Sequence, residues 1–123
     1  VKSHLTFGAE YDSVLEWFIK TEVKTLAEIA EDSTEWSNYC NTENSPKKVV
    51  ETGSREKWCV NNIYDLAGNV DEWTQEQNKS SYRVIRGGNY SINGDFCPVA
   101  YRDWSSPDFS YNDTGFRATL YIK

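Results

Sequence analysis

The chain has no methionine, one histidine and three prolines among its 123 residues, and no apolar run approaches the length of a membrane-spanning helix. Such a helix needs about 20 consecutive apolar residues, so no transmembrane segment is predicted. Residues 1–8 show no basic region followed by a long apolar stretch, which predicts no signal peptide. His4 lies near the terminus and is expected at the surface, so a Ser–His–Asp catalytic triad is disfavoured.

Basic residues and cysteines are also few. Thirteen lysines and arginines stand against 19 aspartates and glutamates, which gives a net charge of −6. A protein that binds nucleic acid or an anionic membrane needs a basic face, so both functions are disfavoured. The three cysteines leave one thiol over in any pairing scheme, and no CxxC spacing indicates zinc. Buried free thiols and a Cys40–Cys59 disulfide remain the two alternatives.

Aromatic residues, by contrast, make up 15% of the chain, and its length fits one domain. Apolar residues at helical spacing predict helices over residues 9–21 and 23–31. A polar, loop-like stretch over residues 32–56 follows. Segments rich in β-branched and aromatic residues then predict short strands over residues 58–64, 82–86, 97–102 and 116–122. Two helices followed by short strands with long connections predict an α+β domain.

Three short motifs stand in order through the second half of the chain. They are Gly68-Asn69-Val70-Asp71-Glu72-Trp73, Arg83-Val84-Ile85-Arg86-Gly87-Gly88 and Gly115-Phe116-Arg117. With Leu5-Thr6-Phe7-Gly8-Ala9-Glu10-Tyr11, this set resembles the motifs of the formylglycine-generating enzyme (sulfatase-modifying factor) family. The resemblance implies a C-type-lectin-like fold with short twisted β-sheets, flanking helices and long loops. It also implies a single domain over residues 1–123 that lacks the N-terminal strand and first helix usual in the family.

Asp65 and Glu72 bracket a tight turn at Gly68-Asn69. Oxygen ligands that converge from two carboxylates and a turn suit a hard cation such as calcium. The resemblance implies a structural calcium ion held by the side chains of Asp65 and Glu72 and by the carbonyls of Gly68 and Val70. The alternative is that both carboxylates accept hydrogen bonds from backbone N–H groups of the turn, without a metal.

Active aerobic members of the family hold copper(I) between two cysteines five residues apart, shortly after the Arg-Gly-Gly motif. Soft copper(I) favours such a thiolate pair. Cys97 stands at the second of these positions, but Ile92 occupies the first. One thiolate cannot form the copper site, so the chain is predicted not to be an enzyme. A copper oxidase of this family and a calcium-dependent lectin remain as rival functions.

Residues 89–114 differ in composition from the rest of the chain. They contain no lysine, glutamate, glutamine or methionine, whereas the other 97 residues hold eight lysines, eleven glutamates and two glutamines. Two polar loops would explain part of this difference, because loops favour Ser, Asn, Asp and Gly. The composition also resembles the variable proteins of diversity-generating retroelements, which randomise a C-terminal segment of this fold that ends near Gly-Phe-Arg. Adenine-directed mutation of Asn codons reaches every residue type in this segment except that of Trp104.

Aromatic side chains give large contact areas at low entropic cost, and Ser, Asn and Gly give adaptable hydrogen bonds. We therefore expect the loops over residues 89–96 and 103–114 to form one exposed binding surface. Its expected aromatic anchors are Tyr90, Phe96, Trp104, Phe109 and Tyr111. The other expected contacts are Asn89, Ile92, Asn93, Asp95, Asp103, Asn112 and Asp113.

Some side chains of this region have other expected roles. Phe96 and Tyr101 have the alternative of pointing inward, because residues 97–102 are predicted to form a strand. Arg102 and Arg117 are expected to pair with acidic residues of the scaffold. The sequence as a whole predicts a non-enzymatic receptor or display domain that binds a protein or a glycan. A phage virion or a bacterial cell surface is the expected location of such a display protein.

Overall fold

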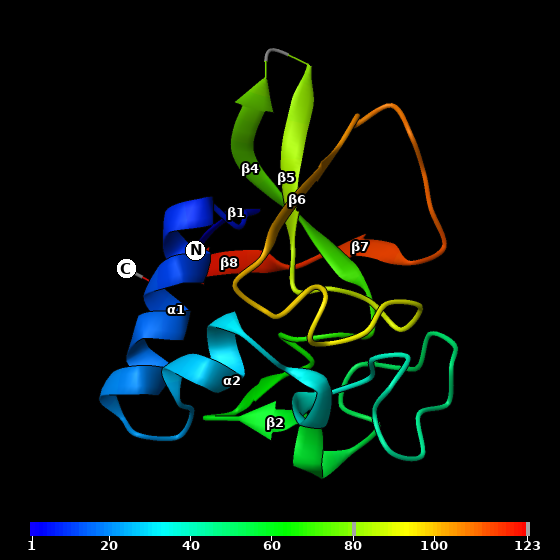
Figure 1. Cartoon of the computed structure of the whole chain (residues 1–123). Helices are drawn as coiled ribbons and strands as arrows, with labels where there is room; N and C mark the ends of the chain where they lie inside the picture. Colours follow the sequence, from blue (N-terminus) through cyan, green and yellow to red (C-terminus); the bar gives the residue numbers. More distant parts are fainter. Residues whose placement is uncertain (80, 123) are drawn as a thin grey trace.

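A computed structural model of the chain describes residues 1–79 and 81–122, and Figure 1 shows the arrangement of its elements. Two α-helices and short 3₁₀ turns accompany three small sheets, which confirms the predicted α+β class with short sheets and long loops. The helical elements are α1 (Gly8–Lys20), α2 (Leu26–Ala30), η1 (Thr34–Trp36) and η2 (Glu56–Trp58). The strands are β1 (Lys2–Leu5), β2 (Cys59–Val60), β3 (Ile63–Tyr64), β4 (Asp71–Lys79), β5 (Tyr82–Arg86), β6 (Arg102–Ser105), β7 (Thr114–Phe116) and β8 (Ala118–Tyr121).

The largest sheet has four strands in the order β6-β5-β4-β7. Its β4–β5 and β5–β6 pairs are antiparallel, whereas β4 and β7 run parallel, with Glu72 opposite Gly115. A second sheet pairs β1 with β8, so the two ends of the chain lie side by side (Figure 1). The third sheet is the β2–β3 hairpin, whose turn residues Asn61 and Asn62 both have positive φ. Asparagine tolerates this conformation better than most residues.

Helix α1 turns one apolar face toward the core. Tyr11, Leu15 and Phe18 are buried there and pack with residues of the loops and turns that follow. The helix starts at Gly8 because the Glu10 carboxylate accepts a hydrogen bond from the backbone N–H of Phe7 at 2.9 Å. Such a bond satisfies one of the N–H groups that a helix start leaves free.

The structure corrects several predicted elements. The second helix spans only Leu26–Ala30, because Thr25 caps it and accepts a hydrogen bond from the Glu28 N–H at 3.2 Å. The strand predicted over residues 97–102 is wrong, since Cys97 and Val99 are buried in turns and β6 starts only at Arg102. Strand β4 was not among the predicted strands.

The three cysteines are free thiols, so the alternative of a Cys40–Cys59 disulfide is not realised. Cys97 is buried, and the other two are half-buried. Within the part of the chain that the structure describes, no helix combines the length and the apolar character needed to cross a membrane.

Candidate ligand-binding surface

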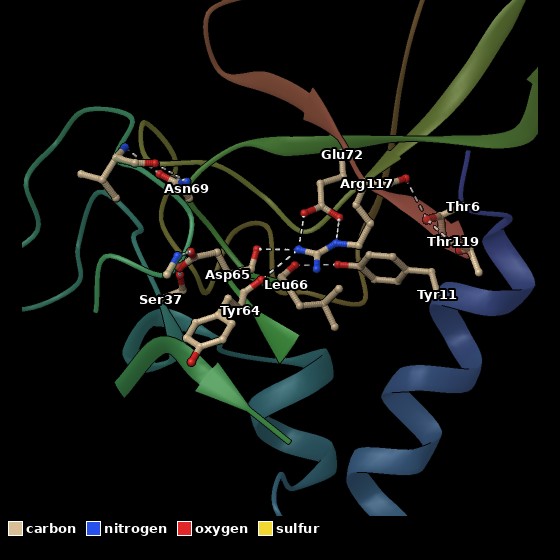
Figure 2. Close-up of polar contacts among 12 residues, drawn as sticks. Thr6, Tyr11, Ser37, Tyr64, Asp65, Leu66, Asn69, Glu72, Arg117 and Thr119 are labelled. Atoms are coloured by element: carbon tan, nitrogen blue, oxygen red, sulfur yellow. Dashed lines mark hydrogen bonds and ion pairs between the residues drawn. The ribbon is translucent and has the colours of Figure 1, made fainter. Parts of the chain in front are cut away.

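The first and third motifs meet in an ion pair. Arg117 donates from Nη2 to Oε1 of Glu72 at 2.6 Å and from Nε to Oε2 at 2.8 Å. The same guanidinium donates to the carbonyls of Tyr64 and Asp65 at 3.0 and 3.3 Å (Figure 2). Burial raises the pKa of Glu72, and Arg117 opposes that shift. Arg117 thus has the structural role that the sequence predicted.

The residues predicted to bind calcium are already engaged. Both oxygens of Glu72 accept from Arg117, while Asp65 accepts from the Gly53 N–H at 2.9 Å and from the Ser37 hydroxyl at 3.3 Å. The alternative without a metal, in which both carboxylates accept from backbone N–H groups of the Gly68-Asn69 turn, is not realised as predicted. Glu72 accepts from the Arg117 side chain, and the backbone donor to Asp65 is Gly53, outside that turn. In this arrangement the oxygen atoms of the predicted ligands fit a calcium ion only if the ion displaces the guanidinium of Arg117 from Glu72. Calcium at Asp65, Gly68, Val70 and Glu72 therefore stays a prediction.

The Gly68-Asn69 turn of the first motif is hydrogen-bonded to the long polar stretch over residues 32–56. The Asn69 side chain exchanges two hydrogen bonds with the backbone of Val50, both at 3.0 Å, and accepts a third from Asn38 at 3.1 Å. Gly68 has a φ of +67°, and a Cβ there would lie 2.8 Å from the carbonyl oxygen of Asn38. Only glycine fits so close a backbone approach without strain.

The second motif anchors the start of the 89–114 segment. A Cβ on Gly88 would lie 2.7 Å from the Tyr39 ring and 2.8 Å from the Cys97 carbonyl oxygen. The Tyr39 hydroxyl donates to the Gly87 carbonyl at 2.7 Å. Arg86 is buried and donates to Asp12 at 2.9 Å. These contacts make the motif a frame for the loop that follows.

Arg102 pairs with acidic residues of the scaffold, as the sequence predicted. It lies 2.7 Å from Asp12 and 3.2 Å from Glu76. Asp12 therefore joins Arg86 and Arg102, which come from two different strands. Sequence analysis did not single out Asp12, because it stands among other acidic residues at the start of a helix.

Asn89 differs from its predicted role as an exposed contact. Its side chain is 2% exposed and donates to Oδ2 of Asp71 at 2.7 Å, while its Oδ1 accepts from the backbone and the hydroxyl of Ser91. These bonds fix the first turn of the loop. Two residues outside the segment also bind this loop. The Cys40 N–H donates to the Ile92 carbonyl at 2.9 Å, and the Asn41 side-chain oxygen accepts from the Gly94 N–H at 3.0 Å.

Large aromatic side chains of the segment face solvent. The exposed fractions are 75% for Phe96, 51% for Trp104, 60% for Phe109 and 50% for Tyr111. Tyr101 is also exposed, so neither it nor Phe96 takes the inward alternative. These residues lie in the yellow loops, on β6 and in the orange arch between β6 and β7 in Figure 1. Tyr90 is half-buried.

Two hollows join the two loops into one surface. The first, of about 490 Å³, is lined by Ser91, Ile92, Asn93, Asp95 and Phe96. The second, of about 240 Å³, is here called the acidic groove. Its lining residues are Asp71, Ile85, Asn89, Ile92, Asp103, Trp104, Ser105, Tyr111, Asp113 and Thr114. Ile92 lines both hollows, so the surface is continuous from one loop to the other. Phe109 and Asn112 lie outside these hollows.

Ile92 and Cys97 occupy the two positions where the family's copper ligands are expected. Burial raises the pKa of the Cys97 thiol to about 11, and the neighbouring Asp71 and Asp103 add to the shift. Burial therefore favours the neutral thiol, and Ile92 offers no sulfur atom at the other position. The residues at these positions do not fit a two-thiolate copper site.

The fold and these motifs define a C-type-lectin-like domain. The chain belongs to the family of sulfatase-modifying factor enzyme 1-like domains, whose model matches residues 15–121. Among solved structures it is similar to variable protein 1 of Treponema denticola, with a TM-score of 0.65 and 27% identity. It is also similar in fold to CarF, with a TM-score of 0.68 and 21% identity.

Each of these matches covers 94% of this chain and 46% of the other protein. The chain therefore spans about half the length of the two solved structures. No curated protein sequence matches it.

Proposed function

We propose that this domain is a non-enzymatic binding module that recognises a protein or a glycan through residues 89–114. One observation carries the proposal: the aromatic side chains of Phe96, Trp104, Phe109 and Tyr111 are half or more exposed, on β6 and on loops that the motifs hold in place. Exposed aromatic groups on a fixed backbone lose little entropy on binding, which favours recognition.

The similarity to variable protein 1 of Treponema denticola supports this role. In the most specific form of the proposal, the domain is the display part of a retroelement-diversified protein of a phage, a prophage or a bacterium. The genomic DNA tests that form directly. A near-copy of the coding segment for residues 89–114 that differs at adenines, beside a reverse transcriptase gene, is expected. A reverse transcriptase neighbourhood without such a copy contradicts diversification but leaves binding untouched.

The non-enzymatic part of the proposal is supported by Ile92 and Cys97. Copper(I) binding by a family oxidase needs two thiolates, and here one of the two positions is the aliphatic Ile92, which leaves Cys97 as a single sulfur ligand. Copper(I) titration is expected to give no stoichiometric complex. A tight one-to-one complex that Cys97→Ser abolishes would revive the oxidase.

Binding itself is tested by probing a random peptide display library and a glycan array with the purified domain. The surface variant replaces Phe96, Trp104 and Tyr111 with serine. A control variant replaces Trp17, Leu26 and Leu120, which are exposed to a similar extent on other elements. Peptides or glycans that bind the wild type and the control, but not the surface variant, are expected. Ligands lost from the control and retained by the surface variant would place the binding site elsewhere.

A further inference from the structure

The acidic groove has carboxylates and aromatic rings but no basic side chain. Asp71, Asp103 and Asp113 line it together with Trp104 and Tyr111, whose rings are half exposed. A groove with this lining presents negative charge and the faces or edges of π-systems to whatever enters it.

Asp71 is the most unusual of these three carboxylates, because it is buried. It is 6% exposed, and Asn89 is the only side chain among the described residues that donates a hydrogen bond to it. Buried carboxylates are normally paired with a cation, because an unpaired charge loses its hydration. Asp71 lines the groove without such a partner.

The other two carboxylates have no cationic partner either. Asp103 accepts from the N–H of Trp104 at 2.8 Å, and Asp113 accepts from the hydroxyl of Thr114 at 3.3 Å. The ion pairs formed by residues 1–79 and 81–122 include neither of them. The neighbouring Arg102 is held by Asp12 and Glu76 and leaves the groove unneutralised.

We infer that the acidic groove receives a basic side chain, an arginine or a lysine, from a protein partner. This inference rests on the proposed binding function and names the chemistry of its partner. A guanidinium or ammonium group pairs with the carboxylates and gains cation–π attraction from Trp104 or Tyr111. Nowhere in the described chain do three acidic, histidine or cysteine side chains lie close enough to hold one metal ion.

The probe for the test is N-acetyl-arginine amide, and its neutral isostere N-acetyl-citrulline amide is the matched control. Each is titrated into the ¹⁵N-labelled domain at an ionic strength of about 0.15 M, at which charge interactions are screened beyond about 8 Å. The arginine probe is expected to shift the Trp104 indole N–H and the Asn89 side-chain amide signals saturably. The citrulline probe is expected to leave them in place.

Variants distinguish the groove from the general negative charge of the domain. Asp103→Asn and Asp113→Asn are each expected to weaken binding of the arginine probe by at least about threefold, because each removes one carboxylate from the groove. Asp108→Asn removes the same charge from the same segment outside the groove and is expected to leave the affinity unchanged. The ¹⁵N spectrum of each variant verifies its fold, and either groove variant suffices if the other fails to fold.

Equal binding of arginine and citrulline amides overturns the inference, and so does a loss in Asp108→Asn as large as in the groove variants. Absence of arginine binding also overturns it. If surface-dependent peptides are still selected in that case, the proposed function stands without the basic partner. If no surface-dependent ligand is found at all, the proposed function fails as well.

Discussion

The guanidinium of Arg117 meets both carboxylate oxygens of Glu72, at 2.6 and 2.8 Å, and joins two motifs that lie 45 residues apart in the chain. The Glu72 side chain is almost fully buried and that of Arg117 is about two-thirds buried. The two-point contact fixes the end of the 89–114 segment against the start of β4. The binding surface is therefore framed by a charge pair as well as by the apolar core.

The Glu72→Gln variant tests this pair. Removing one partner leaves a largely buried guanidinium without its counter-charge, so we expect a loss of about 3 kcal/mol in the free energy of unfolding. Glu16→Gln is the matched control, because Glu16 pairs with Lys20 at 3.8 Å on the exposed face of α1 and should change stability by less than about 0.5 kcal/mol. Urea denaturation measures both. Equal effects would contradict the structural role of the pair.

Asp71 should make stability depend on pH. Burial, with Asp103 and Asp113 nearby, raises its pKa from 3.8 to about 7, although Asn89 opposes the shift. Between these values the folded state holds a proton that the unfolded state has lost, so this residue's contribution to stability falls as the pH rises.

The Asp71→Asn variant removes that contribution. Its stability relative to wild type is expected to be more favourable at pH 8 than at pH 4.5, by at most about 4 kcal/mol for three pKa units. Urea denaturation at the two pH values gives this difference. Asp108→Asn, an exposed counterpart, should give the same relative stability at both. A pH-independent difference for Asp71→Asn would show that its pKa is not raised.

Alanine substitutions at Gly88 and Gly53 distinguish the effect of close packing on stability from the effect of backbone conformation. Both have positive φ, at +73° and +81°, so alanine carries a backbone penalty of about 1 kcal/mol at either position. At Gly88 the added Cβ would also lie 2.7 Å from Tyr39, whereas at Gly53 the nearest atom is 3.7 Å away. Thermal or urea denaturation is expected to show at least about 1 kcal/mol greater loss for Gly88→Ala. Equal losses would mean that the loop moves away from Tyr39 at no cost.

Calcium binding at the predicted ligands is tested through Arg117. The guanidinium of Arg117 occupies both carboxylate oxygens of Glu72, so Arg117→Met is expected to bind calcium more tightly than the wild type. The variant loses the ion pair, so each protein is compared with its own melting temperature without calcium. The measurement is the rise in melting temperature on adding calcium, with magnesium as the control ion. If calcium leaves both proteins unchanged, the site at Asp65, Gly68, Val70 and Glu72 is wrong.

Local sequence patterns predicted the helices and strands that depend mainly on residues close together in the chain. The apolar stripe of α1 gave its bounds to within one residue, and β5 was predicted with its observed ends. The strand over residues 97–102 was wrong because Cys97 and Val99 are apolar for another reason: they fill the core from turns. Richness in β-branched and aromatic residues does not distinguish these two cases.

The exposure of Phe96, Trp104, Phe109 and Tyr111 was predicted from composition, although Tyr90, the fifth expected anchor, is half-buried. The burial of Asn89 was not predicted, because it depends on Asp71, 18 residues earlier in the chain. Asp12 was missed for the same reason, as its partners Arg86 and Arg102 lie 74 and 90 residues away. Pairings at such separations follow from the fold and leave no local signal.

Hydrogen–deuterium exchange of the domain, alone and with a peptide or protein ligand selected on the wild type, tests the central claim most directly. Binding through residues 89–114 should slow amide exchange at residues 90–96 and 103–113 and leave α1 and β8 unchanged. Protection confined to α1, β1 and β8, with these loops unaffected, would contradict the account.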